Sequence, residues 1–113
     1  MACIFCEIAA GRVPAKVVYT GPDVTAFRDI NPQAPTHILI ISNRHIASLA
    51  DVGPSDAALL ARMFEIAKDL ARQEGIAEEG YRIVINTGPN GGQTVPHLHL
   101  HLLGGRRMTW PPG

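Results

Sequence analysis

The chain has 113 residues, of which 46% are hydrophobic and 18% charged, and its ten basic residues balance its ten acidic ones. This length suits one domain that buries most of its apolar surface without disulfide bonds. Balanced charge argues against a nucleic-acid surface or an acidic disordered tail, so any nucleotide ligand should be small. No apolar run approaches the roughly 20 residues that span a bilayer, and the N-terminus lacks a signal pattern, so we expect a cytoplasmic protein without membrane contact.

The first part of the chain predicts a helix and a hairpin. Apolar residues at helical spacing favour a short helix over residues 4–10, which Gly11 would end. Two β-rich runs, 17–20 and 24–28, flank the turn sequence Gly21-Pro22-Asp23. Their spacing predicts an antiparallel hairpin.

The middle of the chain predicts a loop, a buried strand and a long helix. Two prolines make residues 29–36 a loop, and the nearly continuous apolar run 37–42 is typical of a strand buried on both faces. The long helix should open with Ser55 as its N-cap and Asp56 in its first turn, and Gly75 should end it. Its expected apolar face comprises Leu59, Leu60, Met63, Phe64, Ile66, Ala67 and Leu70.

The last part predicts two strands joined by a glycine-rich loop. Residues 81–86 form the first strand, and the glycines of residues 87–93 allow close backbone approach to a ligand. Residues 97–103 form the second strand, and 104–113 form a tail without periodicity that contains the single Trp. This element order predicts one α+β domain over residues 1–113, with helices packed on an antiparallel sheet of about five strands.

The strand 97–103 reads His-Leu-His-Leu-His-Leu-Leu, so three imidazoles share one face. A merely solvated face is one interpretation, and a metal site is another. However, His97 and His101 would lie roughly 13 Å apart on a straight strand, which is too far for one ion to bind both. A nucleophilic His99 flanked by two imidazoles explains more of the neighbourhood, and it predicts covalent catalysis on a phosphate ester or amide.

Three further groups each have two interpretations. Asp29, at the end of a strand, could accept hydrogen bonds from a ribose or could form an Asx-turn. Cys3 and Cys6 are too close in sequence for a favourable disulfide; with His45 and one triad histidine they could bind zinc, or they could be small buried hydrophobes. An apolar slot for a base, or ordinary core, could be formed by Phe5, Ile8, Val13, Phe27 and Ile30.

The alternating pattern His97-x-His99-x-His101 resembles the histidine triad motif, and the chain resembles the Hint branch of histidine triad (HIT) nucleotide-binding proteins. The resemblance implies a HIT-like α+β protomer in a homodimer whose sheet runs across both chains. It also implies hydrolysis of purine nucleoside 5'-phosphoramidates and aminoacyl adenylates through a nucleotidylated histidine. The matching segments are 27–30, 32–37, 91–93, 97–103, 103–106 and 110–113.

The same resemblance implies roles for individual residues. His99 would be the nucleophile and His101 would contact the phosphate, while His97 and His37 would orient the nucleophile. Trp110 in the tail would reach the partner protomer's site. The implied substrate contacts are Asp29 at the ribose, Asn86 at the phosphate and ribose edge, Gln93 and Thr94 at the phosphate and leaving group, Gly92 and Val95 beside them, and Phe5, Ile8, Val13, Phe27 and Ile30 around the base.

The chain also departs from the Hint pattern. Thr94 stands where Ser is usual, Pro96 where an aromatic is usual and Asn31 where Ser is common. Because Thr94 keeps a hydroxyl, we expect an altered leaving-group preference rather than loss of activity. The cysteine pair resembles other branches of the family and related nucleotidyl transferases.

In those relatives two Cys, one His and the first triad His bind zinc. The corresponding set here would be Cys3, Cys6, His45 and His97. Such a zinc would be structural, and the reaction would require no cofactor. Two other functions stay open on the sequence: a nucleotide-binding regulatory dimer with vestigial catalysis, and a metallohydrolase.

Overall fold

The computed structural model describes residues 3–113. The elements are α1 (Ile4–Ala9), β1 (Val17–Thr20), β2 (Val24–Arg28), β3 (Thr36–Ser42), α2 (Ala57–Gln73), β4 (Tyr81–Val84) and β5 (His99–Gly104). Two 3-10 turns, Leu49–Asp51 and Pro54–Asp56, precede α2. This order confirms the predicted α+β class. No helix in the described part of the chain is long and apolar enough to cross a membrane.

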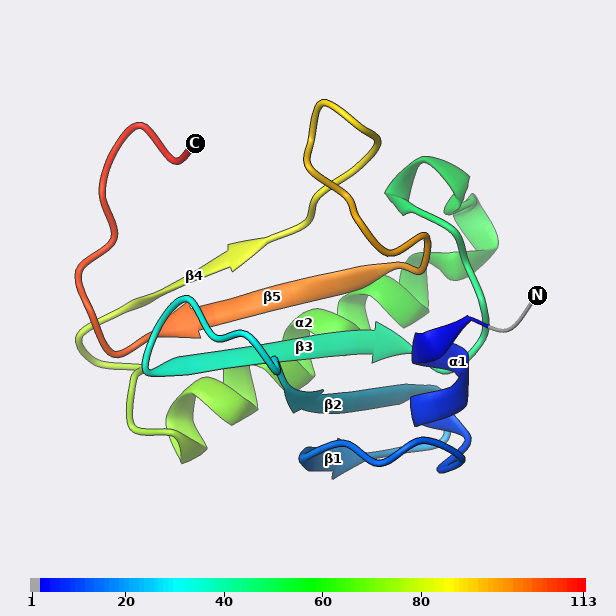
Figure 1. The fold of residues 1–113 in the computed structure, drawn as a ribbon, viewed down its shortest axis with the longest axis horizontal. Helices are drawn as coiled ribbons and strands as arrows, with labels where there is room; N and C mark the ends of the chain where they lie inside the picture. The colour runs from blue at the N-terminus through cyan, green and yellow to red at the C-terminus, as the bar shows by residue number, and fades with distance from the viewer. Residues whose placement is uncertain (1–2) are drawn as a thin grey trace.

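The five strands form one antiparallel sheet in the order β1-β2-β3-β5-β4 (Figure 1). The final strand, β5, therefore lies between β3 and β4. Its register places His99 opposite Ile41 and His101 opposite Leu39. Because residues directly opposite each other in paired strands point to the same face, these histidines share one face with Leu39 and Ile41.

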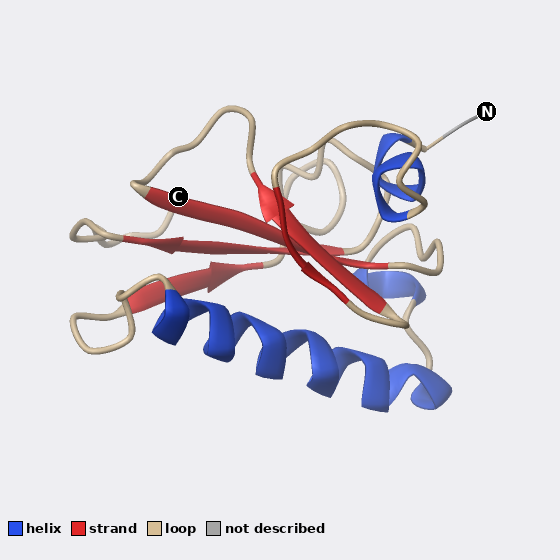
Figure 2. Cartoon of the chain, turned by 90° about the horizontal axis from the view of Figure 1, so that it is seen from below, coloured by secondary structure: helices blue, strands red, loops and turns tan. Residues whose placement is uncertain are grey.

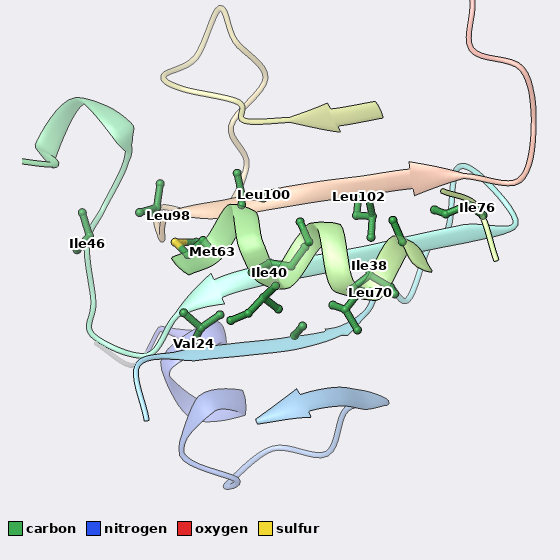
Figure 3. Packing of buried hydrophobic residues seen from close by; sticks show 14 residues of the cluster. Val24, Ile38, Ile40, Ile46, Met63, Leu70, Ile76, Leu98, Leu100 and Leu102 are labelled. Atoms are coloured by element: carbon green, nitrogen blue, oxygen red, sulfur yellow. The ribbon is translucent and has the colours of Figure 1, made fainter. Parts of the chain in front are cut away.

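Helix α2 covers the opposite face of the sheet (Figure 2). The alternating residues Leu98, Leu100 and Leu102 point into this layer, where they are at most 1% exposed. Ile38 and Ile40 of β3 join them against Met63 and Leu70 of α2 (Figure 3). This apolar layer is the main core, and it fixes which face of β5 presents the imidazoles.

Helix α1 lies on the other side of the sheet from α2 (Figure 2). It packs through a smaller apolar cluster that contains Phe5, Ile8, Phe27, Leu39 and Ile41. The short helix thus covers only part of this face, and the remainder is open to a pocket.

Two strand boundaries differ from the sequence predictions by two residues, and two others, the start of β3 and the end of β5, differ by one. Strand β4 ends at Val84 rather than at residue 86, and β5 begins at His99 rather than at residue 97. His97 and Leu98 are nevertheless fully buried. The Leu98 N–H donates to the Ile46 carbonyl at 2.7 Å, so this segment is held by a loop and not by the β3–β5 ladder.

The start of the long helix also differs from the prediction. Ser55 is not an N-cap, because Pro54–Asp56 forms a 3-10 turn and α2 begins at Ala57. The Asp56 carboxylate instead accepts the Gly53 N–H at 3.0 Å. Phe64 is 42% exposed rather than part of the core, and Ala71 is buried. Gly75, with φ +74°, follows the helix and confirms the predicted end.

Candidate active site

A pocket of about 930 Å³ opens on the face of the sheet that carries α1. This volume lies within the range of small-molecule sites. The expected site residues that line it are Phe5, Ile8, Val13, Phe27, Asp29, Ile30, His37, Thr94, Val95, His99 and His101. Phe5, Ile8 and Phe27 are at the same time core residues, and their contact with a base stays a prediction.

Four other expected contacts do not line the pocket of the protomer: Asn86, Gly92, Gln93 and Trp110. The amide of Gln93 is fully bonded to backbone groups. Its Oε1 accepts the Gly88 N–H at 3.1 Å, and its Nε2 donates to the carbonyls of Ala47 and Val95 at 2.7 and 3.1 Å. Trp110 is 81% exposed, and the guanidinium of Arg82 lies 6.0 Å from its ring centroid. The substrate contacts of these four residues stay predictions.

The protons of His99 are fixed by the backbone. Its Nδ1 lies 2.6 Å from the carbonyl oxygen of His97, and a carbonyl can only accept, so Nδ1 carries the proton. In the neutral ring, Nε2 then has the free lone pair. His99 is 6% exposed and lines the pocket. This is the tautomer that a nucleophilic imidazole requires.

A second chain of hydrogen bonds fixes the proton of His101. The Gln33 N–H donates to Nδ1 of His37 at 3.0 Å, so the proton of neutral His37 is on Nε2. Nε2 of His37 lies 2.9 Å from Nδ1 of His101, so His101 Nδ1 accepts this hydrogen bond. The proton of the neutral His101 ring is therefore on its own Nε2. Among the described residues, His101 Nε2 is the buried side-chain polar atom without a hydrogen-bond partner. A ligand oxygen would satisfy it.

Burial keeps both rings neutral. Desolvation lowers the pKa of His37, although the nearby Asp29 carboxylate acts in the opposite direction. Desolvation, with smaller contributions from His99 and His37, lowers the pKa of His101 to about 4. At neutral pH His101 is therefore an uncharged hydrogen-bond donor.

Asp29 forms the Asx-turn considered for it, and its contact with a ribose stays a prediction. Its Oδ1 accepts the Asn31 N–H at 2.8 Å, which is an Asx-turn, and its Oδ2 lies 3.4 Å from Nε2 of His37. The side chain also lines the pocket. The carboxylate is thus held rigidly where a hydroxyl of a ligand could reach it.

The Cys-His cluster (Cys3, Cys6, His45 and His97) fits a tetrahedral metal ion. Cys3 Sγ and Cys6 Sγ lie 3.2 and 3.6 Å from Nδ1 of His97, and Cys6 Sγ lies 3.3 Å from Nδ1 of His45. Ligand atoms around a tetrahedral Zn²⁺ with Cys and His ligands are separated by about 3.3–3.8 Å. Nε2 of His97 lies 2.6 Å from the Ser42 carbonyl and so donates to it, which leaves Nδ1 free for a metal.

Protonation in the Cys-His cluster is consistent with this fit. Desolvation, aided by His45 and His99, lowers the pKa of His97 and keeps its ring neutral. Partial burial and the neighbouring Cys3 raise the pKa of the Cys6 thiol. Two adjacent thiolates therefore disfavour each other unless a cation lies between them.

A second group, Asp29, His37 and His101, also brings three potential ligand atoms together. It does not fit a metal. His37 Nδ1 already accepts the Gln33 N–H, and a neutral imidazole has only one lone pair, so Nε2 cannot bind an ion. This group is a hydrogen-bonded relay instead.

Three contributors were not predicted from the sequence. The backbone N–H of Gln33 and the backbone carbonyl of Ser42 are two of them. Nearly every residue carries these groups, so nothing in the sequence distinguishes these two. Lys16 lines the pocket with its cationic side chain. A basic residue directly before the first strand was the one available signal for it.

Comparison with known proteins gives consistent similarities. A family model described as the HIT domain matches residues 10–108. The purine nucleoside phosphoramidase of Escherichia coli (strain K12) is 53% identical over 105 residues, which cover 93% of this chain and 88% of that protein. The 14 kDa zinc-binding protein of Zea mays is 52% identical over 112 residues, which cover 97% of this chain and 87% of that protein.

A solved structure shows the same similarity in three dimensions. The crystal structure of a HIT family hydrolase from Legionella pneumophila Philadelphia 1 superposes with a TM-score of 0.98 at 57% identity, covering 99% of this chain and 100% of that one. The similarity in sequence and in fold therefore extends over nearly the whole chain.

Proposed function

The chain belongs to the HIT domain family and is a hydrolase, and from this premise we propose that it hydrolyses purine nucleoside 5'-phosphoramidates and aminoacyl adenylates through a nucleotide held covalently on His99. One observation carries the proposal: the 2.6 Å hydrogen bond from His99 Nδ1 to the His97 carbonyl leaves a lone pair on Nε2 of a pocket-lining ring. An imidazole oriented in this way is an effective nucleophile.

The proposed reaction has two displacement steps. His99 Nε2 forms a bond to phosphorus while the P–N or acyl P–O bond breaks; the amine departs with a proton taken from solvent, or the carboxylate departs as an anion. Water then attacks the same phosphorus and releases a proton to solvent, the bond to His99 breaks, and the nucleoside monophosphate leaves. In both steps the Nε2–H of His101 donates to a phosphate oxygen.

The pocket suggests how the nucleotide would lie. Phe5, Ile8 and Phe27 offer apolar surface to the base, and Asp29 would accept from the ribose hydroxyls. The hydroxyl of Thr94 would serve the leaving group. The phosphate would also be contacted by Asn86, Gly92 and Gln93, which do not line the pocket of the protomer and would have to move towards it.

We extend the proposal to a homodimer with one continuous sheet. Strand β4 pairs only with β5 within the described chain, so its other edge is free to pair with a second copy. Trp110 projects into solvent beside this edge strand, where Arg82 donates to the Thr109 carbonyl at 3.0 Å. From there the tail would reach the partner's pocket.

The Cys-His cluster would hold a structural zinc ion, which supplies no chemistry to the reaction when bound. Its thiols would stay reduced in the cytoplasm, the location we propose. The chain's own residues perform every chemical step.

The decisive experiment compares wild type with His99→Ala, using adenosine 5'-phosphoramidate as substrate. We expect wild type to form an acid-labile adduct of one nucleotide per chain, trapped by rapid quenching and located by mass spectrometry. His99→Ala should form no adduct and hydrolyse no substrate. Hydrolysis that survives this substitution contradicts the mechanism, and tight nucleotide binding without any turnover by wild type would indicate a regulatory dimer.

A further inference from the structure

Helix α1 has little intrinsic stability. It has six residues, of which only Phe5 and Ile8 are buried, and Cys3 before it makes no side-chain cap. Isolated helices shorter than about 12–15 residues are marginal in water. The thiols of Cys3 and Cys6 attach the two ends of its first turn to His97 and His45.

Phe5 connects this tethered helix to the nucleophile. It lies between the two cysteines in sequence, and its ring centroid is 5.1 Å from that of His99 in an edge-on arrangement. The same ring lies 5.4 Å from Phe27 and lines the pocket. Any shift of α1 therefore moves both the wall of the pocket and the packing surface of His99.

His97 connects the Cys-His cluster to the nucleophile by a second route. It lies outside the β3–β5 ladder, which ends at the pair Ile41 and His99. Its side chain is held by Cys3 and Cys6 on one nitrogen and by the Ser42 carbonyl on the other. Its carbonyl oxygen is the acceptor that fixes the tautomer of His99.

We propose that the Cys-His cluster, holding a zinc ion, anchors α1 and the His97 carbonyl together, so that Cys3, Cys6 and His45 are positioning residues for nucleoside recognition and for His99. The activity part of this inference rests on the proposed function. The cluster thus acts on the reaction through Phe5 and His97, without touching substrate.

The first test measures structure rather than activity. Amide hydrogen exchange is followed in the full chain with zinc bound, after chelation, and after zinc is returned. Chelation should speed exchange of residues 4–9 and of His99 by at least tenfold, leave β2 and β3 protected, and be reversed by zinc. Unchanged exchange of residues 4–9 after verified zinc removal, or a chain that binds no zinc at all, overturns the proposal.

The second test separates positioning from stability. Hydrolysis of adenosine phosphoramidate is compared with that of methyl phosphoramidate, which has the same P–N bond and no nucleoside. In Cys3→Ser and Cys6→Ser the ratio of the two kcat/KM values should fall about tenfold, on the order of effects seen for residues that support a site indirectly. The single variant His45→Cys keeps four metal ligands and should retain the wild-type ratio.

Met63→Ala is the matched control, because it weakens the core on the α2 face without touching the Cys-His cluster. It should lower both rates together through its unfolded fraction and leave their ratio unchanged. If the cysteine variants show the same ratio as Met63→Ala, the Cys-His cluster contributes only to stability, and the positioning role is wrong. If wild type hydrolyses neither substrate, the proposed function fails, while hydrogen exchange still decides this inference.

Discussion

Nε2 of His37 lies 2.9 Å from Nδ1 of His101, and this contact determines which nitrogen of His101 carries its proton. His37 can donate from Nε2 because its Nδ1 accepts the backbone N–H of Gln33. A loop amide thus sets the tautomer of a ring two hydrogen bonds away. The backbone therefore fixes the tautomers of both His99 and His101, in opposite ways. Nε2 of His99 has a free lone pair, whereas Nε2 of His101 carries a proton.

Replacing His37 with Phe should lower kcat on the order of 10- to 100-fold with a smaller change in KM. The substitution keeps a ring in a buried position but removes the donor that holds the His101 proton on Nε2. A part of the roughly 10²- to 10³-fold contribution typical of a donor to the charge that develops in the transition state is then lost. Steady-state kinetics test the rate, and nitrogen NMR of the imidazoles tests the tautomer. An unchanged kcat would show that His37 does not control His101.

Stability should fall as the pH drops from about 6.5 to 4. The pKa of His101 is lowered from 6.5 to about 4 in the folded chain, so within this window the unfolded chain binds a proton that the folded chain does not. His37, whose pKa is also lowered, acts in the same direction. Above this window the titration of these two groups should no longer change the free energy of unfolding with pH.

Urea unfolding of wild type and His101→Gln across this pH range measures the effect. The variant lacks one of the titrating groups, so its stability should decline less steeply with acid. Zinc held at the proposed site would leave both proteins as the thiolates are protonated, and the difference between the two proteins removes that shared contribution. Parallel curves would contradict the assignment.

Thr94→Ala should slow cleavage of phosphoramidates with poor amine leaving groups about fivefold, which corresponds to one neutral hydrogen bond of about 1 kcal/mol. The side chain lines the pocket and is exposed to a ligand. Thr94→Ser keeps the hydroxyl and should retain the rate while changing the order of preferred amines. The measurement is the rate of hydrolysis for a series of phosphoramidates with different amine leaving groups. Equal rates for wild type and Thr94→Ala across this series would show that Thr94 does not contact the leaving group.

Gln93→Ala should lower the free energy of unfolding by about 1–3 kcal/mol, because three backbone groups lose their partner. Gln93→Glu should be at least as harmful, since a carboxylate cannot donate to the Ala47 and Val95 carbonyls. Gln33→Ala is the matched control. It removes one exposed bond to the Asn31 carbonyl at 3.0 Å and should change stability by less than about 0.5 kcal/mol.

Most of the fold follows from local patterns in the sequence. The hairpin of β1 and β2, the fully buried β3 and the end of α2 at Gly75 all lie where periodicity and turn residues predict them. The errors arise where tertiary contacts override local preference. The Ile46 carbonyl accepts the Leu98 N–H, and Cys3 contacts the His97 ring, so residues 97 and 98 lie outside the ladder although they alternate as in a strand.

The site was only partly predictable. Alternation identified His99 and His101, and residue chemistry suggested the cysteines and His45 as ligands. The direction of each imidazole proton depends on the carbonyls of His97 and Ser42 and on the amide of Gln33. These groups become informative only when the register of β3 and β5 brings them to the rings.

The position of β5 has a consequence for how the chain is made. Of the described strands it is synthesised last, yet it lies between β3 and β4, and β4 pairs with no other strand of the described residues. Until residues 97–104 leave the ribosome, one edge of β3 and both edges of β4 are unpaired, and the whole triad is missing. A chain that stops before residue 97 is therefore an open sheet prone to aggregate rather than a weakened enzyme.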